Sequence, residues 1–480
     1  MRTFAPLRPL FGGPRTAPRL AWLGCAALCL ILASGCEQAA SQGSYDNGAP
    51  HGDWIYFYPN GQRQKAGQYD HGREAGRWTF WYETGQRKQE GDYQNGREDG
   101  PWLFWFENGQ KAKQGTFREG VEHGPWVFWY ESGQRKQEGA YIDGQESGVW
   151  TQWDETGKRR QLLYVDKLAP EQNELVAAIK GSDPAARALA ETTLAGLGTD
   201  GLPALGALLR SSDAGLKIYA AETIGKLGPP GGAAAEALVA LLSDAKETVQ
   251  QAGFAALVQL GPGAVPGLQR ALGTGDPHVR REAARALAAI GPGAEAALGS
   301  LAGTLTDSAP EVAQQAAEAL GKIGPPALKT LTEKYQSNNP VARGLASRGL
   351  AVMANTQPEA LTLLLAGLTE LDPAACDALA ESFGLCPDVA LAPLLALLDD
   401  PSEAVRRNAS RGLGKIGRPA ITQLTDALLN SPHERRRIYA AISLGEMGPI
   451  AASAVPFLRR AEGDQQVRFF ASEAIRKIQK

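Results

Sequence analysis

Tryptophans recur through the first third of the chain at a spacing that could build a binding surface. Trp81, Trp105 and Trp129 lie 24 residues apart. Aromatic rings provide a large contact area at a low entropic cost, so this row could bind a ligand or a partner. A second row keeps the same spacing and contains Trp54, Trp78, Trp102, Trp126 and Trp150. We expect the second row to be structural, because rings in a thin sheet pack on one another, and the first row to be partly exposed.

Arginines gather near the C-terminal end of the chain, where they could bind an acidic partner or a membrane surface. The cluster contains Arg406, Arg407, Arg411, Arg435, Arg436 and Arg437. The alternative is an ordinary solvated face. Over the whole chain, 49 basic and 52 acidic residues give a net charge of −3. This balance provides no general basic excess to hold a nucleic-acid backbone, so we expect no nucleic-acid partner.

Catalytic groups do not converge anywhere in the sequence. It contains no phosphate-binding loop, no G-x-S-x-G nucleophile elbow and no Cys/His cluster with metal-ligand spacing. We therefore predict a binding protein without a catalytic residue, a cofactor or a metal site. An enzyme would instead require a pocket in which polar groups with perturbed pKa values converge.

The N-terminus has the composition of an export signal. Arginines without acidic residues precede an apolar run over 20–33, which is shorter than the roughly 20 residues of a membrane-spanning helix. The run ends in ASGC at 33–36, which resembles the lipobox of bacterial lipoproteins. The resemblance implies a signal peptide over 1–35, a lipidated Cys36 and a membrane-anchored place in the cell envelope, on the periplasmic or surface side. Glu37 favours the outer membrane. An ordinary cleavage site nearby and an uncleaved anchor are the alternatives.

Residues 36–51 are small and polar, and we expect a flexible tether there. The 24-residue unit then recurs five times over 52–168. Each unit has two glycine turns separated by about ten residues of alternating character, so each is predicted to be a β-hairpin. A single hairpin is marginal in water, so the hairpins should stack into a ribbon. The fifth copy departs from the pattern at Gln152, Asp154 and Val165, as capping repeats do.

The motif G-x-W-x-F-W-Y-x-x-G-Q in this ribbon resembles MORN repeats, particularly the variant found in bacterial antitoxin-like proteins. The resemblance implies association with proteins or lipid. An antitoxin-like or immunity-like binder, in which the ribbon occupies a toxic partner, is therefore an alternative function.

From 171 to 480 aromatic residues nearly vanish, and a Leu-Gly or Ile-Gly pair recurs every 30 to 33 residues over much of the segment. An amphipathic helix precedes each pair, and Asp276-Pro277 supplies a cap and a helix start. Each unit is thus predicted to be a helix pair, and about nine pairs should form a solenoid with a concave face for partners. The pattern D-P-x-V-R…A-A-x-A-L-x-x-I-G at 276–291 resembles HEAT repeats, closest to the phycobilisome-lyase type.

The HEAT resemblance suggests what individual side chains do. The position at which HEAT arrays build a charge ladder between units is occupied by Arg280, Arg343, Arg406 and Arg468. Hydroxylase relatives hold iron with several His-Glu pairs, but here only His433-Glu434 qualifies, and nothing marks bilin-lyase chemistry. Cys376 and Cys386 flank a predicted helix, which separates them by about 15 Å, so we expect buried thiols rather than a disulfide.

The predicted fold class is a β + α repeat protein, a MORN-like β-hairpin ribbon followed by an all-α HEAT-like solenoid. The predicted function is that of a lipid-anchored extracytoplasmic scaffold, which binds an unidentified protein partner and contacts the membrane through its N-terminal anchor.

Overall fold

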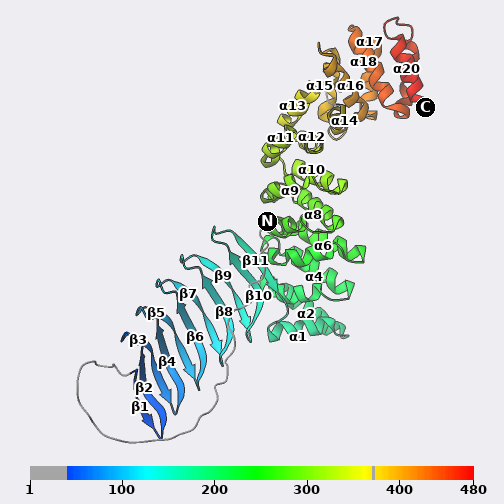
Figure 1. Ribbon diagram of the computed structural model, residues 1–480. Helices are drawn as coiled ribbons and strands as arrows, with labels where there is room; N and C mark the ends of the chain where they lie inside the picture. The colour runs from blue at the N-terminus through cyan, green and yellow to red at the C-terminus, as the bar shows by residue number, and fades with distance from the viewer. Residues whose placement is uncertain (1–39, 370–372) are drawn as a thin grey trace.

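The computed structural model of the chain describes residues 40–369 and 373–480. The predicted signal peptide and Cys36 lie outside this part. A β-sheet and a helical array follow one another along the chain (Figure 1), which confirms the predicted fold class. Among the described helices, none has the length and apolar character needed to cross a membrane.

The sheet contains eleven antiparallel strands, paired in the order of the chain. The strands are β1 (Ser41–Asp46), β2 (Ala49–Phe57), β3 (Arg63–Asp70), β4 (Arg73–Trp81), β5 (Arg87–Gln94), β6 (Arg97–Trp105), β7 (Lys111–Arg118), β8 (Val121–Trp129), β9 (Arg135–Ile142), β10 (Gln145–Trp153) and β11 (Arg159–Tyr164). At the β3–β4 turn, His71 has a φ of 45° and Gly72 a φ of 84°. Two consecutive positive φ angles give a tight hairpin whose twist matches that of its strands.

The sheet begins earlier than the sequence analysis predicts. β1 starts at Ser41, so the prediction of a flexible tether over 36–51 is wrong from residue 41 onward. The segment Gly43-x-Tyr45-x-x-Gly48 repeats, 24 residues earlier, the second half of the first predicted unit. It therefore forms the strand that pairs with β2 and covers its edge.

The buried tryptophan row holds the ribbon together. Trp54, Trp78, Trp102, Trp126 and Trp150 are at most 4% exposed, although the sheet has a single layer. Each indole lies flat on a glycine of the neighbouring strand: a Cβ added to Gly67 would lie 2.2 Å from the ring of Trp78. The indole Nε1 of Trp78 also donates to the carbonyl of Gln68 at 3.0 Å. This row is structural, as expected.

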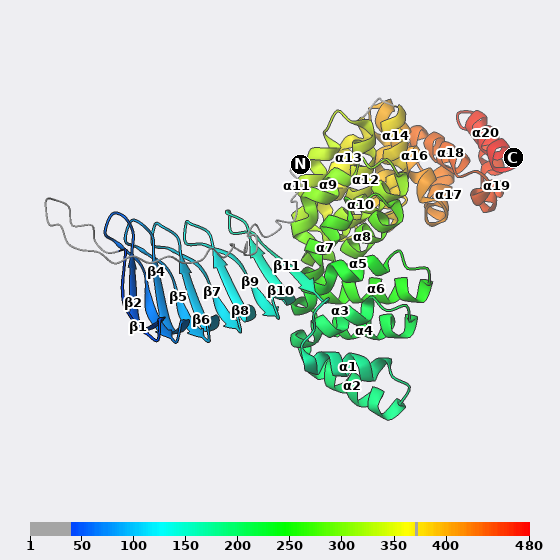
Figure 2. The same cartoon turned by 60° about the horizontal axis from the view of Figure 1, so that its bottom comes forward.

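The helices follow one another in pairs along the second array (Figure 2). They are α1 (Pro170–Lys180), α2 (Pro184–Gly196), α3 (Leu202–Leu209), α4 (Ala214–Lys226), α5 (Ala235–Leu241), α6 (Glu247–Leu260), α7 (Val265–Ala271), α8 (Pro277–Ile290), α9 (Leu298–Thr304), α10 (Pro310–Ile323), α11 (Leu328–Tyr335), α12 (Pro340–Ala354), α13 (Pro358–Ala366), α14 (Pro373–Phe383), α15 (Pro387–Ala396), α16 (Glu403–Ile416), α17 (Ile421–Asn430), α18 (Glu434–Glu446), α19 (Val455–Ala461) and α20 (Arg468–Ile478). From α4 to α20 each even-numbered helix packs on the next one.

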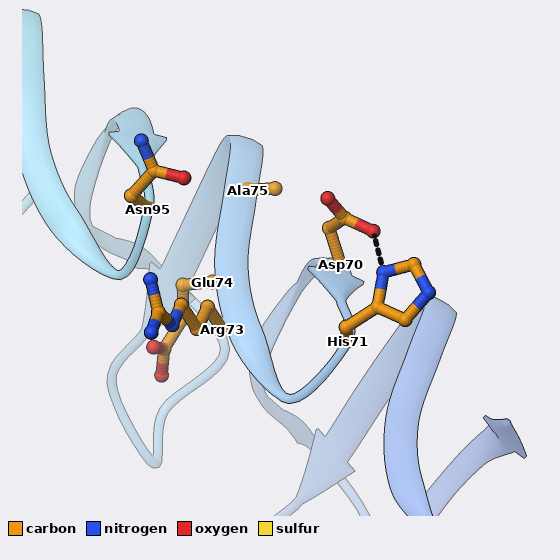
Figure 3. A pocket seen from close by; sticks show the side chains of 6 residues that line it. All are labelled: Asp70, His71, Arg73, Glu74, Ala75 and Asn95. Atoms are coloured by element: carbon orange, nitrogen blue, oxygen red, sulfur yellow. Dashed lines mark hydrogen bonds and ion pairs between the residues drawn. The ribbon is translucent and has the colours of Figure 1, made fainter. Parts of the chain in front are cut away.

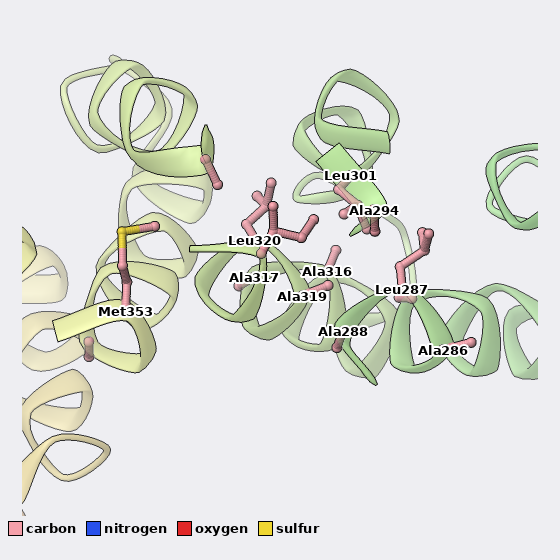
Figure 4. Packing of buried hydrophobic residues seen from close by; sticks show 14 of the residues in the cluster. Ala286, Leu287, Ala288, Ala294, Leu301, Ala316, Ala317, Ala319, Leu320 and Met353 are labelled. Carbon is pink, nitrogen blue, oxygen red and sulfur yellow. The ribbon is translucent and has the colours of Figure 1, made fainter. Parts of the chain in front are cut away.

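Leucine and alanine fill the space between the helices. Leu287 of α8, Leu301 of α9 and Leu320 of α10 are fully buried with alanines between them (Figure 4). Because an alanine side chain is a single methyl group, neighbouring helices can pack closely. The predicted cap is confirmed, since the Asp276 carboxylate accepts from the amide of His278 at 2.9 Å. Cys376 and Cys386 are buried thiols, as expected.

The ribbon joins the solenoid through a shared apolar core. Strands β10 and β11 contact α3, and the Leu163 side chain packs against the helical core. Gly206 of α3 leaves room for the strand, because a Cβ there would lie 2.7 Å from Val165. Outside this core the Arg210 guanidinium donates to Asp166 at 2.6 Å. The two arrays therefore pack as neighbours in one structure (Figure 2).

The last strand pair also changes the register of the ribbon. Gly124 pairs with Tyr141 in β8–β9, whereas Gly148 pairs with Tyr164 in β10–β11. The interpretation that Val165 takes the tyrosine position of the fifth unit is therefore corrected, because Tyr164 takes it. Val165 is instead 8% exposed and faces the helices.

Candidate interaction surfaces

The half-buried tryptophan row follows one end of the strands. Trp81, Trp105 and Trp129 are the last residues of β4, β6 and β8, and each is partly exposed as expected. The row has two further members that were not predicted: Phe57 ends β2, Trp153 ends β10, and both are also half-buried. The 24-residue spacing extends to both positions, so it was the signal that could have found them.

Tyrosine hydroxyls fix this end of the sheet from one unit to the next. Tyr82 donates to the carbonyl of Trp105, and Tyr130 donates to the carbonyl of Trp153, each at 2.8 Å. Tyr58 makes the same bond to Trp81 at 2.8 Å. Burial, followed by the charge of nearby carboxylates, raises the pKa of Tyr82 and of Tyr130 above the ordinary value. The hydroxyls therefore stay protonated and continue to donate, which holds the backbone under the row in place.

Lysines lie over the aromatic rings near the same edge. The Lys111 ammonium lies 5.7 Å from the ring centroid of Trp129. Lys88 lies 5.5 Å from the Tyr82 centroid, and Lys136 lies 5.6 Å from that of Tyr130. A cation at about 6 Å or less from a ring centroid is attracted to its face. The edge thus combines aromatic rings with lysines, and the exposed Glu83, Glu107 and Glu131 lie beside them, so it suits a partner that offers apolar groups and charges of both signs.

The C-terminal arginines do not form one open basic patch. Arg406 of α16 donates to the carbonyls of Asp400 and Pro401, at 2.6 and 2.9 Å, and its guanidinium lies over the ring of Tyr439. Arg411 forms an ion pair with Asp377 of α14. Both side chains therefore link parts of the solenoid to one another.

In α18 the three consecutive arginines point to different surroundings. Arg436 pairs with Asp399 at 2.7 Å, and Arg437 pairs with Asp464 at 2.9 Å. Arg435 is exposed at the start of the helix, and Arg407 of α16 is 64% exposed in a pair with Glu403 of its own helix. Four of the six predicted arginines are thus held within the fold. Arg407 and Arg435 point to solvent, and an ordinary solvated face explains these two side chains as well as a binding patch does.

Three ion pairs join a basic side chain to a carboxylate 27 residues later: Lys217–Asp244 at 2.6 Å, Arg280–Asp307 at 2.7 Å and Arg437–Asp464 at 2.9 Å. The predicted ladder role of Arg280 is confirmed. Its guanidinium binds both oxygens of Asp307, and this hydrogen bonding holds the pKa of the Asp307 carboxyl below its usual range. Arg406 and Arg468, predicted for the same role, instead donate to backbone carbonyls, those of Asp400 and Pro401 and that of Glu462.

Two shallow pockets in the described residues have linings that do not form a catalytic constellation. A pocket of about 270 Å³ lies beside the β3–β4 turn, and its lining contains no serine, threonine or cysteine. Another of about 230 Å³ lies beside α12 and α14 and contains Ser382. That hydroxyl is already bonded to Ser347 and to the carbonyl of Ala378. His433 and Glu434 are exposed where α18 begins.

Comparison with protein families agrees with this architecture. A family model described as MORN repeat variant matches residues 50–71, 75–95, 98–119 and 122–143. A model described as HEAT repeats matches residues 173–258, 235–309, 298–382 and 372–445. The HEAT matches together span more than half of the 480 residues. Both are repeat families, and neither description names an enzyme.

Comparison with solved structures finds karyopherins. The structure of Kap121p bound to the SUMO protease Ulp1p is 15% identical, has a TM-score of 0.35, and aligns over 65% of this chain and 42% of its own. Kap95p bound to RanGDP is 15% identical, has a TM-score of 0.28, and aligns over 64% of this chain and 50% of its own. This chain thus spans half of those proteins or less, and no curated protein sequence matches it. The family matches place the chain among the HEAT-repeat proteins, with an array of the MORN repeat variant ahead of its HEAT repeats.

Proposed function

We propose that the protein is a lipid-anchored extracytoplasmic scaffold that binds a protein partner along its two repeat arrays. The observation that carries this proposal is the half-buried aromatic row of Trp81, Trp105 and Trp129, extended by Phe57 and Trp153. Rigid aromatic side chains that bury further on binding dominate many protein interfaces. Hydrogen bonds from one unit to the next hold the row in place. Binding would therefore cost little further conformational entropy.

The partner should be a protein rather than a small molecule. The row extends over the ends of five alternate strands and is not enclosed, whereas a small ligand needs a concave site that covers most of its surface. Lysines and glutamates both lie beside the aromatic rings. An extended or flat protein surface with apolar residues and charges of both signs would match this edge.

Crosslinking in intact envelopes, followed by purification of the full-length chain, tests the binding proposal. The test variant replaces Trp81, Trp105 and Trp129 by glutamine. The matched control replaces the exposed Glu83, Glu107 and Glu131, two residues further along in the same units, also by glutamine. A central aromatic residue of an interface contributes about 2 kcal/mol or more, so the tryptophan variant should lose its partner by at least about 30-fold while the control keeps it. Equal recovery with both variants would reject the row as the binding surface.

The anchor is tested separately, with Cys36→Ser. Lipidation requires the thiol, and stable anchoring requires more than one acyl chain on the same protein. The serine variant should move from the membrane to the soluble fraction, without a change in the folding of either array. If it still sediments with membranes, the lipid anchor is not what holds the protein there.

The shared core at the junction bears on the antitoxin-like alternative. That function requires the ribbon to act by itself, but Leu163 and Val165 at its end are covered by the helices. Removal of the solenoid would expose both side chains. A scaffold that uses the ribbon and the solenoid together is therefore the better-supported function.

A further inference from the structure

Two histidines and two aspartates meet at the first turns of the sheet. Asp46 ends β1, His51 lies in β2, Asp70 ends β3, and His71 follows Asp70 in the β3–β4 turn. The His71 Nδ1 lies 2.6 Å from Asp70 Oδ1, and Figure 3 shows this contact as a dashed line. The His51 Nδ1 lies 3.8 Å from the same carboxylate oxygen. On the other side of the His71 ring, Nε2 lies 3.8 Å from an oxygen of Asp46.

These groups have the donor types and the separations of a transition-metal site. One nitrogen or oxygen from each of His51, Asp70 and His71 lies within 4.8 Å of the others. Tetrahedral bonds of about 2.0 Å separate neighbouring ligand atoms by about 3.3 Å. Small side-chain rotations would give that arrangement. They would bring His51 Nδ1 closer to Asp70 Oδ1 than 3.8 Å and move His71 Nδ1 further from it than 2.6 Å. All four side chains are at least 44% exposed, which leaves room for such rotations.

The electrostatics of the cluster favour a cation. Among the described residues, Asp46 and Asp70 form ion pairs with histidines. Two carboxylates thus lie together without a lysine or arginine partner there. The His51 Nδ1 is buried, and in the described residues it has no hydrogen-bond partner. A buried polar atom without a partner is costly, and a metal ion would use its lone pair.

A second copy of the same turn, three units later, provides an internal comparison. His123 corresponds to His51, but Arg118 stands where the first copy has Asp46, and Ile142 stands where it has Asp70. Asp143, in the place of His71, binds Arg118 at 2.9 Å and Lys167 at 3.3 Å. Lys167, together with Arg118, lowers the pKa of the Asp143 carboxyl. The Nδ1 of His123 also lacks a partner, so the second imidazole and the unneutralised carboxylates are what distinguish the first copy.

We propose that His51, Asp70 and His71 bind one divalent transition-metal ion of the zinc class. Imidazole nitrogens and a carboxylate oxygen are ligands that Zn²⁺ accepts in tetrahedral sites, and a water molecule can complete the shell. His71 would bind through Nδ1, and its Nε2 then faces Asp46. Ligating histidines commonly donate their second N–H to a carboxylate, which fixes the ring. Asp46 is therefore a positioning residue rather than a ligand.

The proposed site connects the first three strands of the sheet. Asp46, His51 and Asp70 belong to β1, β2 and β3 in turn, and β1 is the edge strand, which pairs only with β2 in the described sheet. A bound ion would join β2 to β3 directly and, by fixing His71 against Asp46, would hold the edge strand to the body of the ribbon. Zn²⁺ should slow amide hydrogen exchange in β1 and leave exchange in β9 unchanged.

The test variant is His51→Ala/Asp70→Gln/His71→Asn in the full chain. Each replacement is the residue found 24 positions later, at Ala75, Gln94 and Asn95, where the same hairpin forms. Asparagine also tolerates the positive φ of His71. The variant should therefore keep the fold, as checked by circular dichroism. The matched control is His123→Ala. Neither change alters a cysteine, so any binding to thiols is common to all three proteins.

Titration calorimetry with ZnCl₂ should give one binding event per chain in the wild type and in His123→Ala, and this event should be absent from the triple variant. With Cu²⁺ as a spectroscopic probe, electron paramagnetic resonance should show coupling to two imidazole nitrogens, which the triple variant loses. Equal zinc stoichiometry in all three proteins would overturn the proposal, as would the absence of binding to the wild type. Unchanged exchange in β1 on addition of Zn²⁺ would also count against it.

Discussion

The packing of each indole on a glycine makes a quantitative prediction for Gly91→Ala. Replacement of a glycine inside a strand usually helps, because glycine loses the most conformational freedom on folding. Here an added Cβ would lie 2.2 Å from the Trp102 ring, whereas carbon atoms in contact are about 3.5–4.0 Å apart. The indole must therefore move by more than about 1 Å. We expect a net loss of stability in place of the usual gain.

The surroundings of Trp102 determine the size of the loss. The indole is 1% exposed, and its centroid lies 5.2 Å from that of Tyr93 and 5.8 Å from that of Phe104. A forced shift in such a packed site costs about 1–3 kcal/mol. The bond from its Nε1 to the carbonyl of Asp92, 3.2 Å long, would also be strained, and loss of such a bond costs about 1 kcal/mol. The expected destabilisation of the ribbon is about 3 kcal/mol.

Urea unfolding followed by two probes measures this effect. Nine of the ten tryptophans lie in the ribbon, with Trp22 the exception, so tryptophan fluorescence reports on the ribbon. Circular dichroism at the helical minimum reports on the solenoid. Gly91→Ala should lower the urea concentration at the midpoint of the fluorescence transition, in proportion to the loss of unfolding free energy. Gly299→Ala is the control, because a Cβ there meets no atom within 4 Å; it should stabilise the helices by up to about 1 kcal/mol. A fluorescence midpoint of Gly91→Ala equal to or above that of the wild type would refute the packing described here.

Other regions give further expectations. Arg280 holds the pKa of the Asp307 carboxyl below its usual range, so the pair stabilises the fold fully above the ordinary carboxyl pKa of about 3.9. This contribution is lost as the pH falls through the lower pKa of the folded state. The difference in unfolding free energy between wild type and Asp307→Asn, measured by urea unfolding, should therefore shrink over that acidic range. Burial raises the pKa of the Cys386 thiol to about 11, so mass spectrometry should find it unmodified by iodoacetamide in the native chain at pH 8 and modified after unfolding. Gly206→Ala should lower the unfolding free energy by about 1–3 kcal/mol, because the new Cβ would lie 2.7 Å from Val165. The urea midpoints followed by fluorescence and by circular dichroism should both fall.

The fold could be predicted from the sequence because both arrays are built from local signals that repeat. Glycine turns and alternating residues define each hairpin, and a capping aspartate, proline and terminal glycine define each helix. The error in the tether has a specific cause. A count of units that begins at Trp54 omits Gly43 and Tyr45, although both keep the phase of the repeat. β1 therefore lies in a segment whose polar composition resembles that of a linker.

The surfaces could be predicted only in part, because they depend on residues that are distant in sequence. The half-buried tryptophan row follows from its period. The arginine cluster could not be interpreted this way, since the carboxylates that bind Arg411 and Arg436 lie 34 and 37 positions earlier, at Asp377 and Asp399. The metal-type cluster likewise depends on strand register: the pairing of Gly52 with Tyr69 is what places the residues on either side of that pair together.

The register change at the last strand pair explains why the ribbon ends where the solenoid begins. In β8–β9 Trp126 pairs with Gly139, the glycine on which the indole of the next tryptophan, Trp150, lies; in β10–β11 Trp150 pairs with Leu162. A further tryptophan would have no glycine on which to lie, so the ribbon cannot continue in the same way. The shift also turns Val165 toward α3. The apolar side chains at the end of the ribbon thus pack into the first part of the solenoid core. A partner that contacts both arrays would therefore meet them in a fixed relation, which is what a scaffold requires and what two arrays on a flexible linker would not provide.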